Sequence, residues 1–217
     1  MPRSITTQSL TLSAAVGNAV CASQTPAGAG LLTIDGANAA GGVYTAPTNP
    51  RYLSITTAAN ESAKTFTITG TDRNGHPLVY ATAGASSATT TVYTVSFQTI
   101  TSVAVSAATT GAITVGFAAQ GATGWIPLDR AASPVIGIGI QLSTSANLTF
   151  TMQSTYDDVQ VNGFQESDAY PIASTVVTGT ASAAHTITHV ASAIRFVVNP
   201  WTAGTATFTV IEKSVSL

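Results

Sequence analysis

The amino-acid sequence predicts an all-β protein, and three observations support this fold class. Apolar and polar residues alternate with a period of two, which is typical of strands that bury one face and expose the other. Thr, Val and Ile, whose branched side chains favour extended strands, recur in these segments, whereas the i, i+3, i+4 spacing of a helix is absent. Turn signals separate the segments, and they include Asn74-Gly75, Thr110-Gly111, Asn162-Gly163 and Ala203-Gly204.

The first thirty residues are small and polar, with few aliphatic anchors. Residues 1–30 can therefore form an N-terminal arm that crosses onto a neighbouring subunit, or an edge strand of the first sheet, and of the two we expect the edge strand. Ser13, Gly17 and Asn18 interrupt the apolar stretch that follows Leu10. We therefore do not expect this stretch to act as a secretory signal.

Strands of the alternating type are clearest at Phe66–Thr69 and Tyr93–Gln98 in the first half, and at Leu148–Gln153 and Thr205–Val210 in the second. The Asn-Gly pair after the first of these segments readily adopts the positive φ angles of a tight turn, although residues 71–75 also allow a longer loop. The pattern therefore predicts antiparallel sheets built from consecutive strands.

Two pairs of segments resemble each other. Val103–Val105 followed by Ile113–Val115 is similar to Ile194–Val198 followed by Ala206–Val210, and we interpret each pair as a hairpin with a glycine in its loop. Because the second pair lies at the end of the chain, the first is expected to end a domain. A domain boundary is therefore predicted within residues 118–122.

This boundary gives two antiparallel β-sandwich domains in tandem, of the jelly-roll or immunoglobulin-like kind. The N-terminal domain spans residues 1–120, including the possible arm, and the C-terminal domain spans residues 121–217. Each half is close to the usual size of an antiparallel sandwich. A single larger sandwich is the alternative, because all-β domains can reach about 200 residues.

Four residues are candidates for a subunit interface. Gly137 and Gly139 alternate with isoleucines along one predicted strand, and a face of glycines lets another backbone, of the same chain or of another subunit, approach closely. Trp125 and Trp201 lie in loop-like contexts, where tryptophan serves either as an interface anchor or as a lid on the core. The sequence leaves these two interpretations open.

The scarcity of charge is the main functional observation. Only 7% of the 217 residues are charged, against about 25% in a typical soluble domain. Interface cores are depleted in Lys, Glu and Asp because an unpaired charge is expensive to desolvate. Seven Lys and Arg residues at a net charge of −2 do not suit a nucleic-acid partner, and no apolar run approaches the length of a membrane span.

No motif predicts catalysis, a metal or a cofactor. His185 and His189 are four residues apart, which on a strand is about 13 Å, too far to share one ion. Asp157, Asp158, Glu166 and Asp168 form the densest acidic region, but their spacing matches no defined calcium loop. His76 follows a turn and is expected to be exposed, while the single cysteine, Cys21, is expected to be a small buried side chain.

Several segments resemble those of structural proteins from tailed bacteriophages. They lie in both halves of the chain, at 53–62, 66–75, 124–129, 156–159 and 204–211. The resemblance implies a virion protein built of β-sandwich domains, of the head decoration or cement type, which sits on the capsid lattice as a symmetric oligomer. It implies no catalytic residues.

The sequence therefore predicts a non-enzymatic virion structural protein that is assembled in the host cytoplasm. Its expected partners are the major capsid protein or other virion proteins and further copies of itself, as a trimer or dimer. Two other classes remain as alternatives: a glycan-binding host-recognition module of a tail or head fibre, and a secreted bacterial surface protein.

Overall fold

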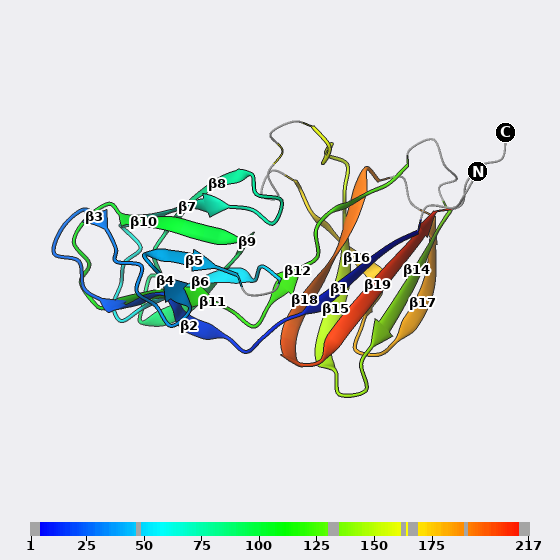
Figure 1. Cartoon of the computed structure of the whole chain (residues 1–217), viewed down its shortest axis with the longest axis horizontal. Coiled ribbons are helices and arrows are strands. Elements are labelled where there is room, and N and C mark those ends of the chain that lie inside the picture. The colour runs from blue at the N-terminus through cyan, green and yellow to red at the C-terminus, as the bar shows by residue number, and fades with distance from the viewer. Residues whose placement is uncertain are drawn as a thin grey trace. The chain divides into compact units, whose positions relative to one another are not determined.

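The computed structural model describes residues 5–46, 49–129, 135–161, 164, 169–188 and 191–212, and every regular element in them is a strand (Figure 1). The predicted all-β class is therefore confirmed. The chain divides into two compact units. Unit 1 comprises Met1–Ser13 and Ala122–Leu217, and unit 2 comprises Ala14–Gly121, so unit 2 is inserted after the first strand of unit 1.

Unit 1 contains two antiparallel sheets. The first has the strand order β1 (Ile5–Thr11), β19 (Thr205–Glu212), β14 (Val135–Leu142) and β17 (Ala183–Thr188). The second has the order β12 (Gly121–Ala122), β18 (Ala193–Ala203), β15 (Asn147–Thr155) and β16 (Ile172–Gly179), and β13 (Ile126–Pro127) also pairs with β18.

One hydrophobic core lies between these two sheets. Ile138 and Phe208 of the first sheet and Phe150 and Phe196 of the second are all buried in the same cluster. The rings of Phe196 and Phe208 stack across the core, with their centroids 4.2 Å apart and their planes 5° from parallel. Two sheets that enclose a single core form a β-sandwich.

Unit 2 is also built from two antiparallel sheets. The first has the order β2 (Val16–Gln24), β11 (Ile113–Phe117), β6 (Tyr52–Thr57) and β9 (Thr89–Ser96). The second has the order β4 (Ala39–Ala40), β5 (Val43–Thr45), β10 (Thr99–Val105), β7 (Thr65–Thr71) and β8 (Pro77–Ala83), and β3 (Gly30–Leu31) also pairs with β10. Its own core includes the stacked rings of Tyr44 and Phe117, 4.6 Å apart.

The two units share one topology. We number the strands of each unit along the chain and count the short pieces β3–β5, or β12 and β13, as the second strand. The order is then 1-8-3-6 in one sheet and 2-7-4-5 in the other, in both units. This is the arrangement of an eight-stranded jelly roll, in which consecutive strands repeatedly cross from one sheet to the other.

The N-terminal strands differ from the predicted domain composition. We predicted that residues 1–120 form the first domain, but β1 pairs with β19 along its whole length, from Ile5 opposite Ile211 to Thr11 opposite Thr205 (Figure 1). It therefore belongs to the same unit as residues 122–217. Residues 1–30 were predicted to form either an arm onto a neighbouring subunit or an edge strand. The structure has two edge strands there, β1 and β2, and each pairs with a strand of this chain.

The two segment pairs predicted as hairpins do not form hairpins, but they occupy equivalent positions in the two units. β10 and β11 are the seventh and eighth strands of unit 2, as β18 and β19 are of unit 1, but the strands of each pair lie in different sheets. Alternation shows that a strand buries one of its faces, but not which of two facing sheets contains it. A true hairpin connects β7 and β8, through the longer loop that the sequence allowed: Thr71 pairs with Pro77, and Gly75 has φ of 83°.

Candidate functional site

The outer face of sheet β1-β19-β14-β17 is free of charge. Alternate residues of a strand point to opposite sides, so the odd-numbered residues of β1, β14 and β19 and the even-numbered residues of β17 point away from the buried core. All of these outward residues are Thr, Ser, Gly, Ala, Gln, Ile or Val. We call this surface the threonine face.

Hydroxyl groups on the threonine face bond to one another across β1 and β19. Thr7 lies opposite Thr209, with 3.3 Å between their Oγ1 atoms. The same pairing joins Ser9 to Thr207 at 3.1 Å and Thr11 to Thr205 at 2.7 Å. The hydroxyls therefore keep a hydrogen-bond partner when water leaves this surface.

Gly137 and Gly139 lie in the middle of the threonine face. Both are partly exposed on β14, as the predicted alternation with the buried Ile136, Ile138 and Ile140 requires. A Cβ atom added at Gly137 would be 3.7 Å from the Cβ of Ile211, and one added at Gly139 would be 3.8 Å from the Cβ of Thr209. These are ordinary contact distances, so alanine would fit at both positions.

The two tryptophans have partners within unit 1. The guanidinium of Arg195 lies over the Trp125 ring, 4.5 Å from its centroid, and the indole Nε1 of Trp125 is buried without a hydrogen-bond partner in the described part of the chain. Trp201 packs against the core, and its indole N–H donates to the carbonyl of Gly204 at 2.9 Å. Neither tryptophan lies on the threonine face, and their interface role stays a prediction.

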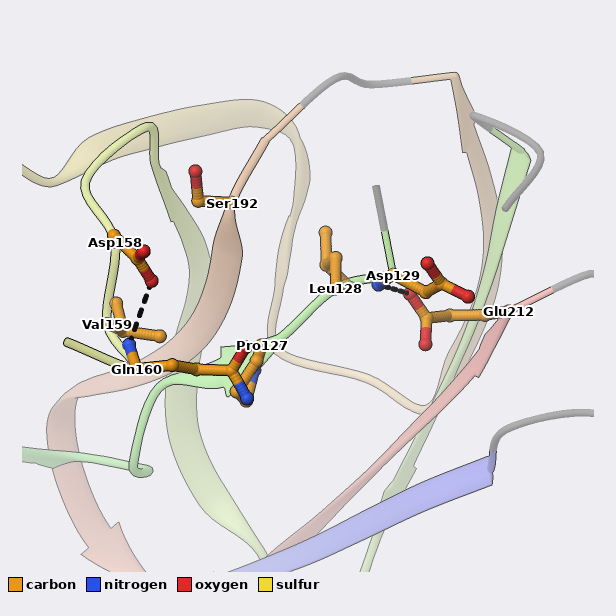
Figure 2. Close-up of a pocket in the computed structure, with 8 residues that line it drawn as sticks. All are labelled: Pro127, Leu128, Asp129, Asp158, Val159, Gln160, Ser192 and Glu212. Atoms are coloured by element: carbon orange, nitrogen blue, oxygen red, sulfur yellow. Dashed lines mark hydrogen bonds between the residues drawn. The ribbon is translucent and has the colours of Figure 1, made fainter. Parts of the chain in front are cut away.

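A pocket of about 590 Å³ opens beside β13, near the end of β19 (Figure 2). Figure 2 shows Asp129 and Glu212 on one side and Asp158 on the other. Glu212 is almost buried, and its Oε1 accepts the backbone N–H of Asp129 at 2.7 Å. The pocket is lined by Pro127, Leu128, Asp129, Asp158, Val159, Gln160, Ser192 and Glu212.

Two exposed tyrosines lie close to this pocket in the fold. Tyr156 is 62% exposed and Tyr170 is 76% exposed. Ser192, which lines the pocket, donates its hydroxyl to the carbonyl of Tyr156 at 2.7 Å. Asp157 accepts the backbone N–H of Tyr170 at 2.6 Å, and this bond, together with one from the Thr155 hydroxyl, lowers the pKa of Asp157. Sequence reasoning identified the aspartates but missed the tyrosines, because exposure cannot be read from residue type.

Of the residues weighed for catalysis or metal binding, His76 belongs to unit 2, whereas His185, Asp157 and Asp158 belong to unit 1. His76 is exposed, and its Nδ1 lies 3.5 Å from Oδ2 of Asp72. His185 is on β17, and its buried Nε2 has no hydrogen-bond partner among the described residues. His189, Glu166 and Asp168 lie outside the described residues. Within the described ranges, no three His, Cys, Asp or Glu side chains gather as metal ligands would.

Cys21 is fully buried, as predicted. Burial, assisted by the charge of Asp35, raises the pKa of its thiol to about 12. A thiol with this pKa is protonated at neutral pH, and thiolate is the nucleophilic form. Cys21 is therefore a packing residue of β2.

Basic side chains are largely covered in the part of the chain that the structure describes. Arg51 and Arg195 are each only 5% exposed, and Lys64 and Arg73 are partly buried. Arg51 donates to the carbonyl of Ala14 at 2.6 Å. The described residues therefore offer no exposed basic patch for phosphate groups. No helix in the described segments has the length and hydropathy that crossing a membrane requires.

Comparison with protein-family models, with curated proteins and with solved structures finds no match to this chain. Its function must therefore be argued from its own surfaces.

Proposed function

We propose that this protein is a non-enzymatic structural component of a tailed-bacteriophage virion, a capsid decoration protein that binds the head lattice as an oligomer. Its partners are then the major capsid protein or other virion proteins and further copies of itself. The role requires packing against other subunits and no chemistry, cofactor or metal.

The observation that carries the proposal is the threonine face, a whole sheet surface without charge. A free monomer ordinarily covers such a surface with Lys, Glu, Asp and Arg for solubility. Uncharged, small side chains with paired hydroxyls are inexpensive to desolvate, which suits contact with protein. The buried thiol of Cys21 suits this role, because it is not available as a nucleophile.

The topology supports the same class. Jelly rolls occur in viral capsid proteins and in lectins. Because one fold hosts several functions, the topology only narrows the choice, and the surface decides between the two. The threonine face favours the structural role.

Quantification of the chain in purified virions tests this role. Particles from the lysate of the host strain would be separated on a density gradient, and the chain would be quantified against the major capsid protein by mass spectrometry. Hundreds of copies per particle are expected for a decoration protein. A few copies would indicate a fibre, and absence from the particles would refute the virion role.

The salt dependence of attachment is a second test. Contacts of uncharged residues are not screened by ions, whereas the Debye length falls from about 10 Å at 0.1 M salt to about half of that at 0.5 M. The protein should therefore stay on its particle when NaCl is raised over this range. Release at 0.5 M NaCl would indicate a charge-steered interface.

A glycan-binding role is the second candidate, and the exposed Tyr156 and Tyr170 favour it. Exposed aromatic rings beside convergent polar groups are typical of sites that bind small polar ligands. Here Asp158, Gln160 and Ser192 supply those groups in the adjacent pocket. Binding of the full chain to a glycan array, abolished by Tyr156→Ala and Tyr170→Ala, would support this role over the structural one.

A further inference from the structure

We propose that the threonine face of unit 1 is the contact surface for a second copy of this chain, in a dimer with a two-fold axis parallel to β19. The inference rests on the proposed role in subunit packing and specifies which surface performs it. Four observations support it: two glycines that no contact within the chain requires, the paired hydroxyls, the area of the face and the order of residues across the strands.

No contact within the chain requires glycine at positions 137 and 139. At some glycines inside the fold the chain itself excludes a side chain: a Cβ at Gly116 would be 2.7 Å from the carbonyl oxygen of Gly17, and one at Gly84 would be 2.7 Å from the Cβ of Glu61. Neither clash exists at Gly137 or Gly139, and neither residue has a positive φ. Glycine inside a strand weakens it, so the pair points to close approach by something outside the chain.

The face is inexpensive to dehydrate. The three hydroxyl pairs between β1 and β19 retain their mutual hydrogen bonds when solvent is removed, so each hydroxyl keeps one hydrogen-bond partner. No charge has to be desolvated, and a second copy of the same face brings no like charge against it. These properties make the face compatible with itself, which a two-fold interface requires.

The area of the face is close to what a dimer needs. Four strands of six to eight residues, spaced about 4.8 Å apart with about 3.3 Å per residue, cover about 460 Å² in projection. Two such faces bury about 900 Å² in total, near the roughly 1,000 Å² expected of a specific interface.

The cross-strand order places a protrusion opposite a depression. Ile5, Ile211 and Gly137 lie side by side in one row, with Ile211 in the middle. Rotation by 180° about an axis parallel to β19 therefore sets Ile5 of each copy over Gly137 of the other. Ile5 is 61% exposed, so its side chain is available to fill the space that the glycine leaves. Thr209, central in the next row, then faces Thr209 of the second copy.

Charge exchange at Thr209 tests this geometry. The mass in solution of the full-length protein would be measured by light scattering during gel filtration at tens of micromolar, and we expect twice the chain mass. Thr209→Lys places two like charges across the axis and should give a monomer, as should Thr209→Glu. An equimolar mixture of the two variants should restore the dimer, because opposite charges then meet.

Two controls separate loss of contact from loss of folding. Thr90→Lys is the matched variant, since Thr90 is an exposed strand threonine of unit 2 whose hydroxyl pairs with Thr56 at 2.7 Å; it should remain dimeric. Circular dichroism should show that each lysine variant retains the β spectrum. A monomeric or trimeric wild type, a dimeric Thr209→Lys variant, or a mixture that stays monomeric would overturn the inference.

The failure of this inference is distinguishable from failure of the proposed function. A monomer that is nevertheless abundant in virions would refute the two-fold contact and leave the virion role. A dimer with the expected charge-exchange behaviour that is absent from virions would refute the virion role and leave the contact.

Discussion

The guanidinium of Arg195 in unit 1 covers the partly buried indole ring of Trp125, 4.5 Å from the ring centroid. Arg195 is 5% exposed, and its Nε donates to Oε1 of Gln153 at 2.9 Å. Arg195→Lys removes the planar group that stacks on the ring and the Nε donor. We therefore expect a decrease of about 1–2 kcal/mol in the free energy of unfolding.

Urea unfolding followed by tryptophan fluorescence measures this effect selectively, because both tryptophans of the protein, Trp125 and Trp201, belong to unit 1. Trp125→Phe keeps an aromatic face beneath the guanidinium and should cost less than the lysine substitution. An Arg195→Lys variant as stable as the wild type would show that the stacking contributes nothing to unit 1.

Glu61 joins two loops of unit 2. Its Oε1 accepts the backbone N–H groups of Thr110 and Gly111 at 2.7 and 2.8 Å, and Lys64 lies 2.9 Å from its Oε2. Burial alone would raise the pKa of this carboxyl. The hydrogen bonds from Lys64, Gly111 and Thr110 and the charge of Lys64 outweigh that effect, and the pKa of Glu61 is lowered from 4.5.

A carboxyl with a lower pKa in the folded than in the unfolded state stabilises the fold above its unfolded pKa, and this contribution is lost as pH falls through the folded value. The stability of unit 2 should therefore decline as pH falls below about 4.5. Glu61→Gln should lower the free energy of unfolding by roughly 1–3 kcal/mol at pH 7 and flatten the decline in acid. Denaturant titration by circular dichroism at several pH values measures both effects, and parallel pH profiles for the two proteins would contradict the assignment.

The sequence was sufficient to predict the strands but not their partners. Alternation at residues 148–153 and 205–210 located β15 and β19, because a half-buried strand must alternate. The partner of β1 was not predictable, since its alternating pattern suits the edge of any sheet. Only the register with β19, which lies about two hundred residues away in the chain, assigns Ile5–Thr11 to unit 1.

The candidate site was partly predictable for a similar reason. The alternation of glycine with isoleucine predicted that Gly137 and Gly139 lie on the strand face opposite the isoleucines, and in β14 that face is the partly exposed one. The absence of charge over the whole face depends on which strands are neighbours, and therefore on topology. The proximity of Tyr156 and Tyr170 depends on the path of the chain after β15, which leaves no pattern in the sequence.

Cys21 should resist alkylation in the folded protein. Its thiol is fully buried and its pKa is raised to about 12. At pH 8 the alkylating reagent therefore cannot reach the sulfur, and the thiol is in its unreactive protonated form. Treatment with iodoacetamide followed by mass spectrometry should give no adduct in buffer and complete modification in denaturing urea. Rapid modification in buffer would show that β2 opens on the timescale of the reaction.

Two glycines with positive φ angles provide a matched test of local packing. Gly204, between β18 and β19, has φ of 89°, and Gly75, between β7 and β8, has φ of 83°. A Cβ added at Gly204 would lie 2.8 Å from the Cβ of Ala146 and from the Oγ of Ser143, whereas one added at Gly75 would meet nothing within 4 Å. The two sites therefore share the backbone strain and differ in the steric clash.

Gly75→Ala should cost about 1–2 kcal/mol, the penalty of a left-handed backbone for a residue with a Cβ. Gly204→Ala should cost about 2–5 kcal/mol, because the added methyl group also displaces Ala146 and weakens the 3.1 Å hydrogen bond from the Thr205 N–H to the Ser143 hydroxyl. Urea unfolding monitored by circular dichroism measures both variants. Equal losses at the two positions would show that strain alone governs them and that the turn between β18 and β19 adjusts to the methyl group.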